Sequence, residues 1–155
     1  MDSIDKKLLN KVQRDFPVVS QPYAAMAKDL GVSEQEVCDR LDALVKQKII
    51  RKIGASIAPR TIGYTTTLVA ASVRDEKLEE VATSVNAYPE ITHNYGREHE
   101  FNLWFTIVGR DRDEIKRICN EIAALDGVIQ LMELPATHLF KLDVFFDFCK
   151  EGESA

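Results

Sequence analysis

The chain has few cysteines, and they are too scattered to form a site together. Only three occur in 155 residues, Cys38, Cys119 and Cys149. An odd number of widely spaced cysteines favours neither a disulfide framework nor a zinc site, so we interpret them as buried or half-buried thiols in a reducing compartment. The sequence also lacks any apolar run near the roughly 20 residues that a membrane span needs. Its first residues, M-D-S-I-D-K-K, lack the apolar core of a signal peptide, which favours a cytoplasmic protein.

Positive charge is scarce where a nucleic-acid-binding protein would need it. The net charge is −5, with 11 Lys and Arg against 8 Asp and Glu in residues 1–62 and 9 against 17 in the rest. The first part is therefore mildly basic and the second distinctly acidic. A compact nucleic-acid binder usually carries a stronger basic footprint. The hydrophobic share of 45% and the charged share of 29% are typical of one or two small globular domains.

Residues 1–62 have the pattern of a helix-turn-helix with a wing and a linker. Three short helices are predicted, the first capped by Asp2 or Ser3 and the second ended by Gly31. The third begins with a capping box of Ser33 and Glu36, and two helices joined by a tight turn are typical of this motif. The run I-I-R-K-I-G-A-S-I that follows is predicted to form the two strands of the wing.

The predicted recognition helix, Ser33 to Lys48, is poorly suited to DNA. Its N-terminal half carries mostly carboxylates, which phosphates repel, apart from Gln35 and Arg40. The wing adds Arg51 and Lys52, but two cations bind duplex DNA only weakly at physiological salt. We interpret the motif as a structural or dimerising element, so DNA is not an expected partner. A working DNA reader is the alternative.

From residue 63 onward the pattern alternates between strands and helices. The order strand, helix, strand, strand, helix, strand over residues 63–148 predicts a ferredoxin-like βαββαβ domain. The fold class is therefore α+β, a winged helix-turn-helix followed by a ferredoxin-like domain. The last run, broken by Pro135, is expected to be extended, and residues 149–155 are predicted to be a tail.

The stretch T-H-N-Y-G-R-E-H-E-F-N-L-W-F, residues 92–105, is an unusually polar part of this strand pattern. Alternation in its second strand predicts one apolar face, packed against the helices and made of Phe101, Leu103, Phe105 and Ile107. The opposite face, with Asn102, Trp104 and Thr106, is left for a ligand or another chain. Trp104 at a dimer interface is the plain alternative.

His93, Tyr95, Arg97 and His99 lie within seven positions of one another. A histidine taken singly is more simply interpreted as a satisfied sheet or turn residue. Two imidazoles that exchange protons near neutrality, beside an anion-binding guanidinium, favour a functional site instead.

Residues 1–148 as a whole resemble the Lrp/AsnC family, in which a helix-turn-helix precedes a ferredoxin-like effector domain. The segment H-N-Y-G-R-E-H-E-F-N-L-W-F is similar to the signature of one branch, the siroheme decarboxylases of alternative haem and haem d1 biosynthesis. The ending E-L-P-A-T-H-L-F-K-L-D-V-F-F-D-F and the acidic helix-turn-helix agree with that branch. The resemblance implies a carboxy-lyase that removes two acetate carboxylates of siroheme, with no cofactor beyond this iron tetrapyrrole. It also implies a homologous second subunit or a homodimer.

The resemblance also implies roles for individual residues. His93 or His99 would protonate the carbanion left by departing carbon dioxide, or would ligate the substrate iron. Arg97 would bind a substrate carboxylate. Tyr95 would donate a hydrogen bond or hold a histidine in place, and Trp104 would stack on the macrocycle.

Further candidates for substrate binding are Asn102, Arg51, Lys52 and His138. Each also has a simpler interpretation. The Asn102 amide would orient a neighbouring side chain, Arg51 and Lys52 would be solvated cations, and His138 would be a surface histidine. The protein alone is expected to form no metal site. Two other functions stay open at this point: an Lrp/AsnC-type transcriptional regulator with a small effector, and a haem-binding sensor without catalysis.

Overall fold

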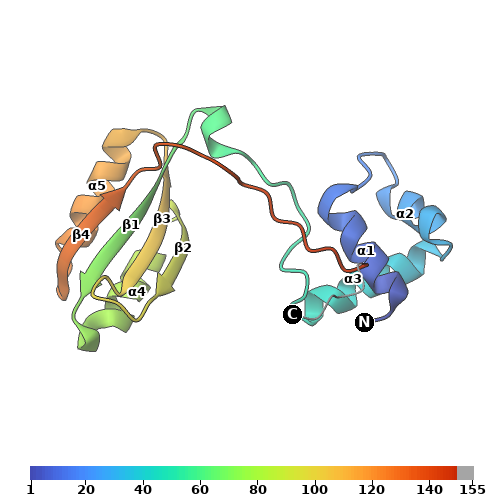
Figure 1. Cartoon of the computed structure of the whole chain (residues 1–155), viewed down its shortest axis with the longest axis horizontal. Coiled ribbons are helices and arrows are strands. Elements are labelled where there is room, and N and C mark those ends of the chain that lie inside the picture. The colour runs from blue at the N-terminus through green and yellow to red at the C-terminus, as the bar shows by residue number, and fades with distance from the viewer. Residues whose placement is uncertain (150–155) are drawn as a thin grey trace. The chain divides into compact units, whose positions relative to one another are not determined.

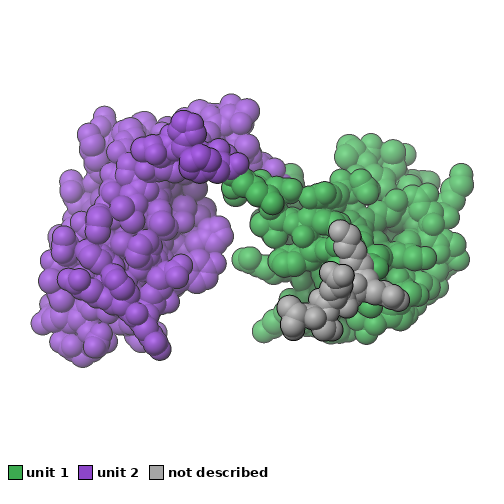
Figure 2. All heavy atoms as spheres, viewed as in Figure 1, with its two compact units in different colours: residues 1–55, 141–155 green, residues 56–140 purple. Residues whose placement is uncertain are grey.

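The computed structural model describes residues 1–149 and divides into two compact units (Figure 1, Figure 2). A helical unit contains residues 1–55 and 141–149, and an α/β unit contains residues 56–140. The predicted succession of three helices followed by a strand–helix alternation is confirmed. Within residues 1–149, no helix combines the length and the apolarity that crossing a membrane requires.

The helical unit is built from α1 (Ser3–Arg14), α2 (Pro22–Leu30) and α3 (Glu34–Lys46). Asp2 caps α1, and Gly31 ends α2 in the left-handed conformation with φ of 71°. The three helices bury one apolar cluster, made of Leu8, Leu9, Met26, Ala27, Val37, Leu41 and Leu44.

The predicted two-stranded wing is wrong for the described residues. No strand lies between α3 and the short helix η1 (Pro59–Ile62), and residues 51–57 make no backbone–backbone hydrogen bond within residues 1–149. The two arms on either side of Gly54 are only a few residues long, and an isolated two-stranded hairpin is marginal in water. The alternating sequence therefore produces an extended segment without a partner strand.

Residues 141–149, here called the strap, run along α1. The amide of Gln13 accepts the Phe146 N–H at 2.9 Å and donates to the Phe146 carbonyl oxygen at 3.0 Å, as a neighbouring strand would. One helical turn earlier, the Asn10 amide oxygen accepts the Phe148 N–H at 3.0 Å. The side chains of α1 thus hold the strap in an extended conformation.

The two units differ from the predicted division at residues 62/63 and 148/149. Residues 56–62 belong to the α/β unit, and residues 141–148 belong to the helical unit. Alternation shows that a segment is extended, but it does not reveal which surface the segment lies on. Of the predicted tail, only Cys149 is among the described residues.

The α/β unit contains β1 (Thr65–Val73), η2 (Asp75–Lys77), α4 (Leu78–Asn86), β2 (Ile91–Gly96), β3 (Leu103–Gly109), α5 (Arg112–Ala123) and β4 (Val128–Leu134). The four strands form an antiparallel sheet in the order β2-β3-β1-β4, as expected for a ferredoxin-like domain. Both α4 and α5 pack on one face (Figure 1). The other face, here called the open face, has no helix over it within this unit.

The predicted alternation in β3 is confirmed for Leu103, Phe105 and Ile107, which are buried against the two helices. Phe101 does not join them. It lies before β3 begins and is half-buried, with its ring centroid 6.3 Å from that of His99. β3 begins only at Leu103, so the strand pattern does not extend back to Phe101.

Two of the three cysteines are enclosed, as predicted. Cys119 is buried and Cys38 is half-buried, whereas Cys149 is exposed. Burial raises the pKa of the Cys119 thiol to about 11, so it stays protonated near neutrality.

Candidate functional site

The open face carries the hairpin residues in which the sequence predicts a site. Tyr95 on β2 pairs with Trp104 on β3, and His93 pairs with Thr106. Paired residues of an antiparallel sheet project from the same face, and alternate residues project from opposite faces. Asn94, between the two, points to the helical side, where its amide donates to α4. His93, Tyr95, Trp104 and Thr106 therefore share the open face.

The strand register extends this site across the whole sheet. Two rows of paired residues cross the four strands: Tyr95, Trp104, Ala70 and Met132, and next to it His93, Thr106, Leu68 and Leu134. Leu68 and Met132 are exposed. The result is an uncovered sheet face with an aliphatic half on β1 and β4 and an aromatic and polar half on β2 and β3. Sequence reasoning missed Leu68 and Met132, because the strand register is needed to place them beside Trp104.

A hairpin loop at residues 97–102 forms the polar end of this face. The Arg97 N–H donates to the Asn102 carbonyl oxygen at 2.9 Å, and the His99 N–H donates to the Arg97 carbonyl oxygen at 3.0 Å. An open hollow of about 770 Å³ lies beside the loop, lined by Gly96, Arg97, Glu98, His99 and Trp104. The loop brings Arg97 and His99 to one hollow with Trp104, whereas His93 and Tyr95 do not line it.

Arg97 is placed to receive an anion. Its guanidinium carbon lies 5.5 Å from the ring centroid of Trp104, and the indole N–H donates to the Phe101 carbonyl oxygen at 2.7 Å. A cation over the face of a fixed tryptophan is held by the ring quadrupole. Arg97 is exposed and forms no salt bridge with any residue from 1 to 149, so its planar fork stays available for a carboxylate.

The two histidines differ in their hydrogen bonds. Nδ1 of His99 accepts the Phe101 backbone N–H at 3.1 Å, and this bond needs an unprotonated Nδ1. The neutral ring of His99 therefore carries its proton on Nε2. Nδ1 of His93 lies 3.0 Å from the Thr92 hydroxyl, which both donates and accepts, so every protonation state of His93 is compatible with that contact.

Glu98 is a lining residue that sequence reasoning did not select. It is exposed, and its carboxylate belongs to the same hollow as Arg97 and His99. A search of this stretch for charged side chains of either sign would have found Glu98 beside Arg97.

Asn102 does not lie on the open face. It is only 8% exposed, and its amide oxygen accepts the Val73 N–H at 2.9 Å while its amide nitrogen donates to the Val73 carbonyl oxygen at 2.7 Å. A weaker bond of 3.3 Å reaches Asp75 in η2. The side chain joins the hairpin loop to the end of β1, so the prediction that Asn102 lies on the open face is wrong.

We expect the Asn102→Leu substitution to destabilise the α/β unit. Leucine has a similarly branched side chain but leaves the buried Val73 N–H and C=O without the asparagine amide, at about 1–3 kcal/mol each. The free energy of unfolding, measured by urea denaturation, should fall by about 2–6 kcal/mol. Asn120→Leu, at an exposed position on α5, is the matched control and should change it by less than about 0.5 kcal/mol. Equal effects of the two substitutions would contradict the assigned role.

The remaining candidates lie elsewhere. His138 follows β4, is exposed with its ring 5.6 Å from that of Phe140, and does not line the hollow. Arg51 and Lys52 belong to the helical unit, where Lys52 lines a separate cavity. Among residues 1–149, no three His, Cys, Asp or Glu side chains are grouped closely enough to hold a metal ion.

The predicted recognition helix has little free positive charge at its start. Arg40 on α3 pairs with Asp2 at 2.8 Å, Asp5 at 2.8 Å and Glu36 at 2.9 Å. Hydrogen bonds to these carboxylates raise the pKa of Arg40 above its ordinary value. The cation therefore joins α3 to α1, which supports a structural interpretation of the helix-turn-helix.

Comparison with known proteins places the chain in a family. Residues 5–51 match the family model of the siroheme decarboxylase NirDL-like HTH domain, and residues 61–141 match that of the AsnC-like ligand binding domain. The siroheme decarboxylase alpha subunit of Desulfovibrio desulfuricans is 44% identical over 154 residues, covering 99% of this chain and 87% of that protein. The chain belongs to the siroheme decarboxylase family. The siroheme decarboxylase NirD subunit of Stutzerimonas stutzeri is 40% identical over 146 residues, covering 94% of this chain and 95% of that protein.

Solved structures agree with this family and with the predicted fold. The siroheme decarboxylase NirDL, crystallised with an iron-uroporphyrin III analogue, is similar with a TM-score of 0.65 and 30% identity, covering 91% of this chain and 48% of that one. Escherichia coli AsnC has a TM-score of 0.78 at 17% identity, covering 94% of this chain and 97% of that one. The second likeness concerns the fold alone, and it confirms the Lrp/AsnC-like architecture.

Proposed function

We propose that this chain is a subunit of a siroheme decarboxylase. In this proposal it acts as a carboxy-lyase that converts siroheme to didecarboxysiroheme, by removing two acetate carboxylates without oxidation, in alternative haem biosynthesis. The observation that carries the proposal is the 44% identity to a siroheme decarboxylase alpha subunit over 99% of the chain. The open face supports it, because its shape and its charged groups suit an iron tetrapyrrole.

The open face can accommodate a planar macrocycle. The rows through Trp104 and Leu68 present aromatic and aliphatic surface over four strands, and a flat ring buries most area on a flat apolar surface. Siroheme carries several carboxylates at its rim. Arg97, whose guanidinium forms no salt bridge within residues 1–149, would bind one of them bidentately.

The chemistry requires one proton for each carbon dioxide lost. The bond between the acetate methylene and its carboxylate breaks, the electron pair is delocalised into the macrocycle, and a proton converts the methylene to a methyl group. The donor must hold a proton at the working pH, pass it to the methylene carbon, and take up another proton before the second loss. A histidine suits this task, because its proton exchange falls near neutrality.

His93 fits the proton donor and His99 fits an anchor. An imidazolium at position 93 can donate from Nδ1 to the Thr92 hydroxyl and keep Nε2–H for the substrate. An imidazolium at position 99 would place a proton on Nδ1, against the Phe101 N–H that donates there. Iron ligation through Nε2 of a neutral His99 would require the same Nδ1 proton. His99 therefore acts as a neutral Nε2–H donor to a substrate carboxylate.

A second subunit is part of the proposal. The relatives are named as alpha and NirD subunits, and the NirDL chain is about twice as long as the part that this chain covers. That remaining length is sufficient for a second unit of similar size. A second subunit of this fold would cover the open face and enclose the macrocycle, excluding water from the reacting carbons.

Anaerobic incubation of the protein with siroheme tests the proposal. We expect a product lighter by two carbon dioxide units in mass spectrometry, formed without an added oxidant or reductant. Heat-denatured protein is the control for spontaneous loss. Spectral binding of siroheme without any mass change, with a partner subunit also present, would identify a sensor instead and reject the enzyme.

A further inference from the structure

Thr92 lies beside His93 on the open face because β2 is irregular at this point. The register of β2 against β3 shifts by one residue between Ile91 and His93, which is a β-bulge. Ile91 packs into the core under the helices, and Asn94 also points to the helical side. Residues on one face of a regular strand are an even number of positions apart, whereas these two are three apart. Both residues between them, Thr92 and His93, therefore face the open side, and both are exposed.

The bulge brings the Thr92 hydroxyl to the imidazole of His93. Oγ1 of Thr92 lies 3.0 Å from Nδ1 of His93. Consecutive residues of a regular strand point to opposite faces and could not make this contact. Within residues 1–149 the hydroxyl has no other hydrogen-bond partner, so its one contact is with this ring.

Tyr95 restrains the His93 ring but does not choose its edge. The two ring centroids lie 6.1 Å apart with an interplanar angle of 27°, which limits tilting of the imidazole. A rotation of 180° about the Cβ–Cγ bond keeps that plane but exchanges Nδ1 with Cδ2 and Nε2 with Cε1. The torsion about this bond is broad and roughly twofold, so the two orientations have similar intrinsic energies. Within residues 1–149, the Thr92 hydroxyl is the group that distinguishes the nitrogen from the carbon.

A hydroxyl suits a ring that gains and loses protons. It accepts from the Nδ1–H of an imidazolium, and it can turn to donate to an unprotonated Nδ1. The contact at His93 therefore survives each step of a proton transfer. At His99 the partner is the Phe101 backbone N–H, which can only donate, so that ring is held in one state.

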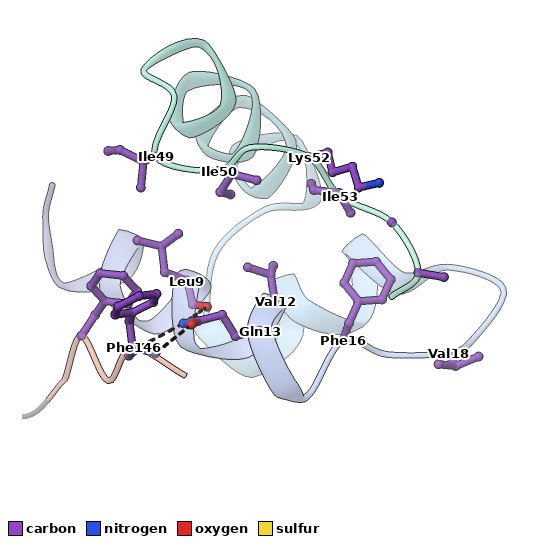
Figure 3. Close-up of a pocket in the computed structure, with 13 residues that line it drawn as sticks. Leu9, Val12, Gln13, Phe16, Val18, Ile49, Ile50, Lys52, Ile53 and Phe146 are labelled. Atoms are coloured by element: carbon purple, nitrogen blue, oxygen red, sulfur yellow. Dashed lines mark hydrogen bonds between the residues drawn. The ribbon is translucent and has the colours of Figure 1, made fainter. Parts of the chain in front are cut away.

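The helical unit offers no ring of this kind. Figure 3 shows its apolar cavity of about 540 Å³, with Leu9, Val12 and Phe16 of α1 on one wall and Ile49, Ile50 and Ile53 on the other. Gln13 and Lys52 are the only polar side chains among its lining residues within 1–149, and no histidine lines it. This cavity suits apolar contact, so we place proton transfer on the open face.

We propose that Thr92 is a positioning residue that holds the His93 ring with Nε2 toward the bound substrate. The inference rests on the proposed function, because it concerns the proton donor of that reaction. Nε2–H passes its proton to the methylene carbon, Nδ1 keeps its proton and donates it to Thr92, and Nε2 is protonated again before the second loss. A flipped ring would present Cε1–H instead, which has no acidic proton to give.

Nitrogen NMR of the histidine rings tests the contact without siroheme. Thr92→Val keeps the branched shape but removes the hydroxyl, so the Nδ1 resonance of His93 should shift because it loses its fixed partner. Thr92→Ser should keep the parental resonance. The chain has three histidines, so His99→Ala and His138→Ala assign the rings. Thr65→Val is the matched control, because the Thr65 hydroxyl on β1 makes no hydrogen bond within residues 1–149, and it should leave all three rings unchanged.

Steady-state turnover of siroheme, with the partner subunit present, measures the consequence for catalysis. Thr92→Val should lower kcat about two- to tenfold, which is the effect of one neutral hydrogen bond. KM should stay the same, because the hydroxyl acts on the His93 ring and not on the substrate. Thr92→Ser should retain most of the parental rate.

Three results would overturn the proposal: an unchanged Nδ1 resonance in Thr92→Val, an unchanged kcat, or a rise in KM alone. Equal loss of rate in Thr92→Val and Thr92→Ser would also contradict it, because serine keeps the hydroxyl. A parent protein that leaves siroheme unchanged would reject the decarboxylase, whereas the nitrogen spectrum still decides whether Thr92 holds the ring.

Discussion

His93→Ala should slow the decarboxylation of siroheme at least about hundredfold, because a positioned general acid typically contributes a factor of 10²–10⁴. The effect should fall on kcat, since the proton is needed only after the carbon–carbon bond begins to break. The His93 ring contacts only the side chains of Thr92 and Tyr95 within residues 1–149, and it makes no hydrogen bond to the loop backbone. The substitution should therefore leave the open face intact. Single-turnover formation of the lighter product under anaerobic conditions gives the rate.

Added imidazole distinguishes a proton donor from a structural residue. It should restore part of the rate in His93→Ala, and the absorption spectrum of bound siroheme should be the same in both proteins. His99→Ala should retain most of kcat, because we assign that ring to holding a carboxylate. A changed iron spectrum in His93→Ala would make His93 an iron ligand, and full activity in His93→Ala would refute both roles.

Arg97→Ala should weaken siroheme binding, with a roughly ten- to hundredfold rise in KM. A hydrogen bond to a charged group contributes about 1.5–3 kcal/mol, and this guanidinium has no salt bridge within residues 1–149 to lose instead. The rate with saturating substrate should change much less, because the anchor acts on the ground state and the transition state alike. Titration of the siroheme absorbance gives the dissociation constant directly.

Two further substitutions test the geometry of that anchor. Arg97→Lys keeps the charge but not the planar fork, and should recover only part of the affinity. Trp104→Leu removes the ring beneath the guanidinium, and should cost about 0.5–1 kcal/mol, or roughly a two- to fivefold loss of affinity. Arg97→Ala with unchanged affinity would show that another cation binds the substrate carboxylates.

Local signals predicted most of the fold. Caps and glycine stops are local, so the boundaries around Asp2, Gly31 and Ser33 agree with the structure. Alternation identified β3 because one face of that strand is buried. The wing failed for the opposite reason. A strand needs a partner, and the alternating pattern at residues 49–57 does not reveal that the described chain provides none.

The sequence indicated which residues belong to the candidate site, but not how those residues are placed relative to one another. The density of polar groups in residues 93–99 singled out His93, Tyr95, Arg97 and His99, which the structure places on one hairpin, and their roles stay predictions. The long-range part could not be found from the sequence. Asn102 contacts Val73, 29 positions away, and only these hydrogen bonds show that its buried amide joins the hairpin loop to β1 and does not lie on the open face.

The hairpin loop fixes its own shape by short-range bonds. The Arg97 N–H, the Phe101 N–H and the Trp104 indole each have a partner within the same few residues, and Asn102 joins the loop to β1. Immobilising a flexible side chain on binding costs about 0.5–1.5 kcal/mol of entropy. Here that ordering takes place when the polypeptide folds, so an incoming tetrapyrrole meets groups that already stand in position and retains more of its contact energy as affinity.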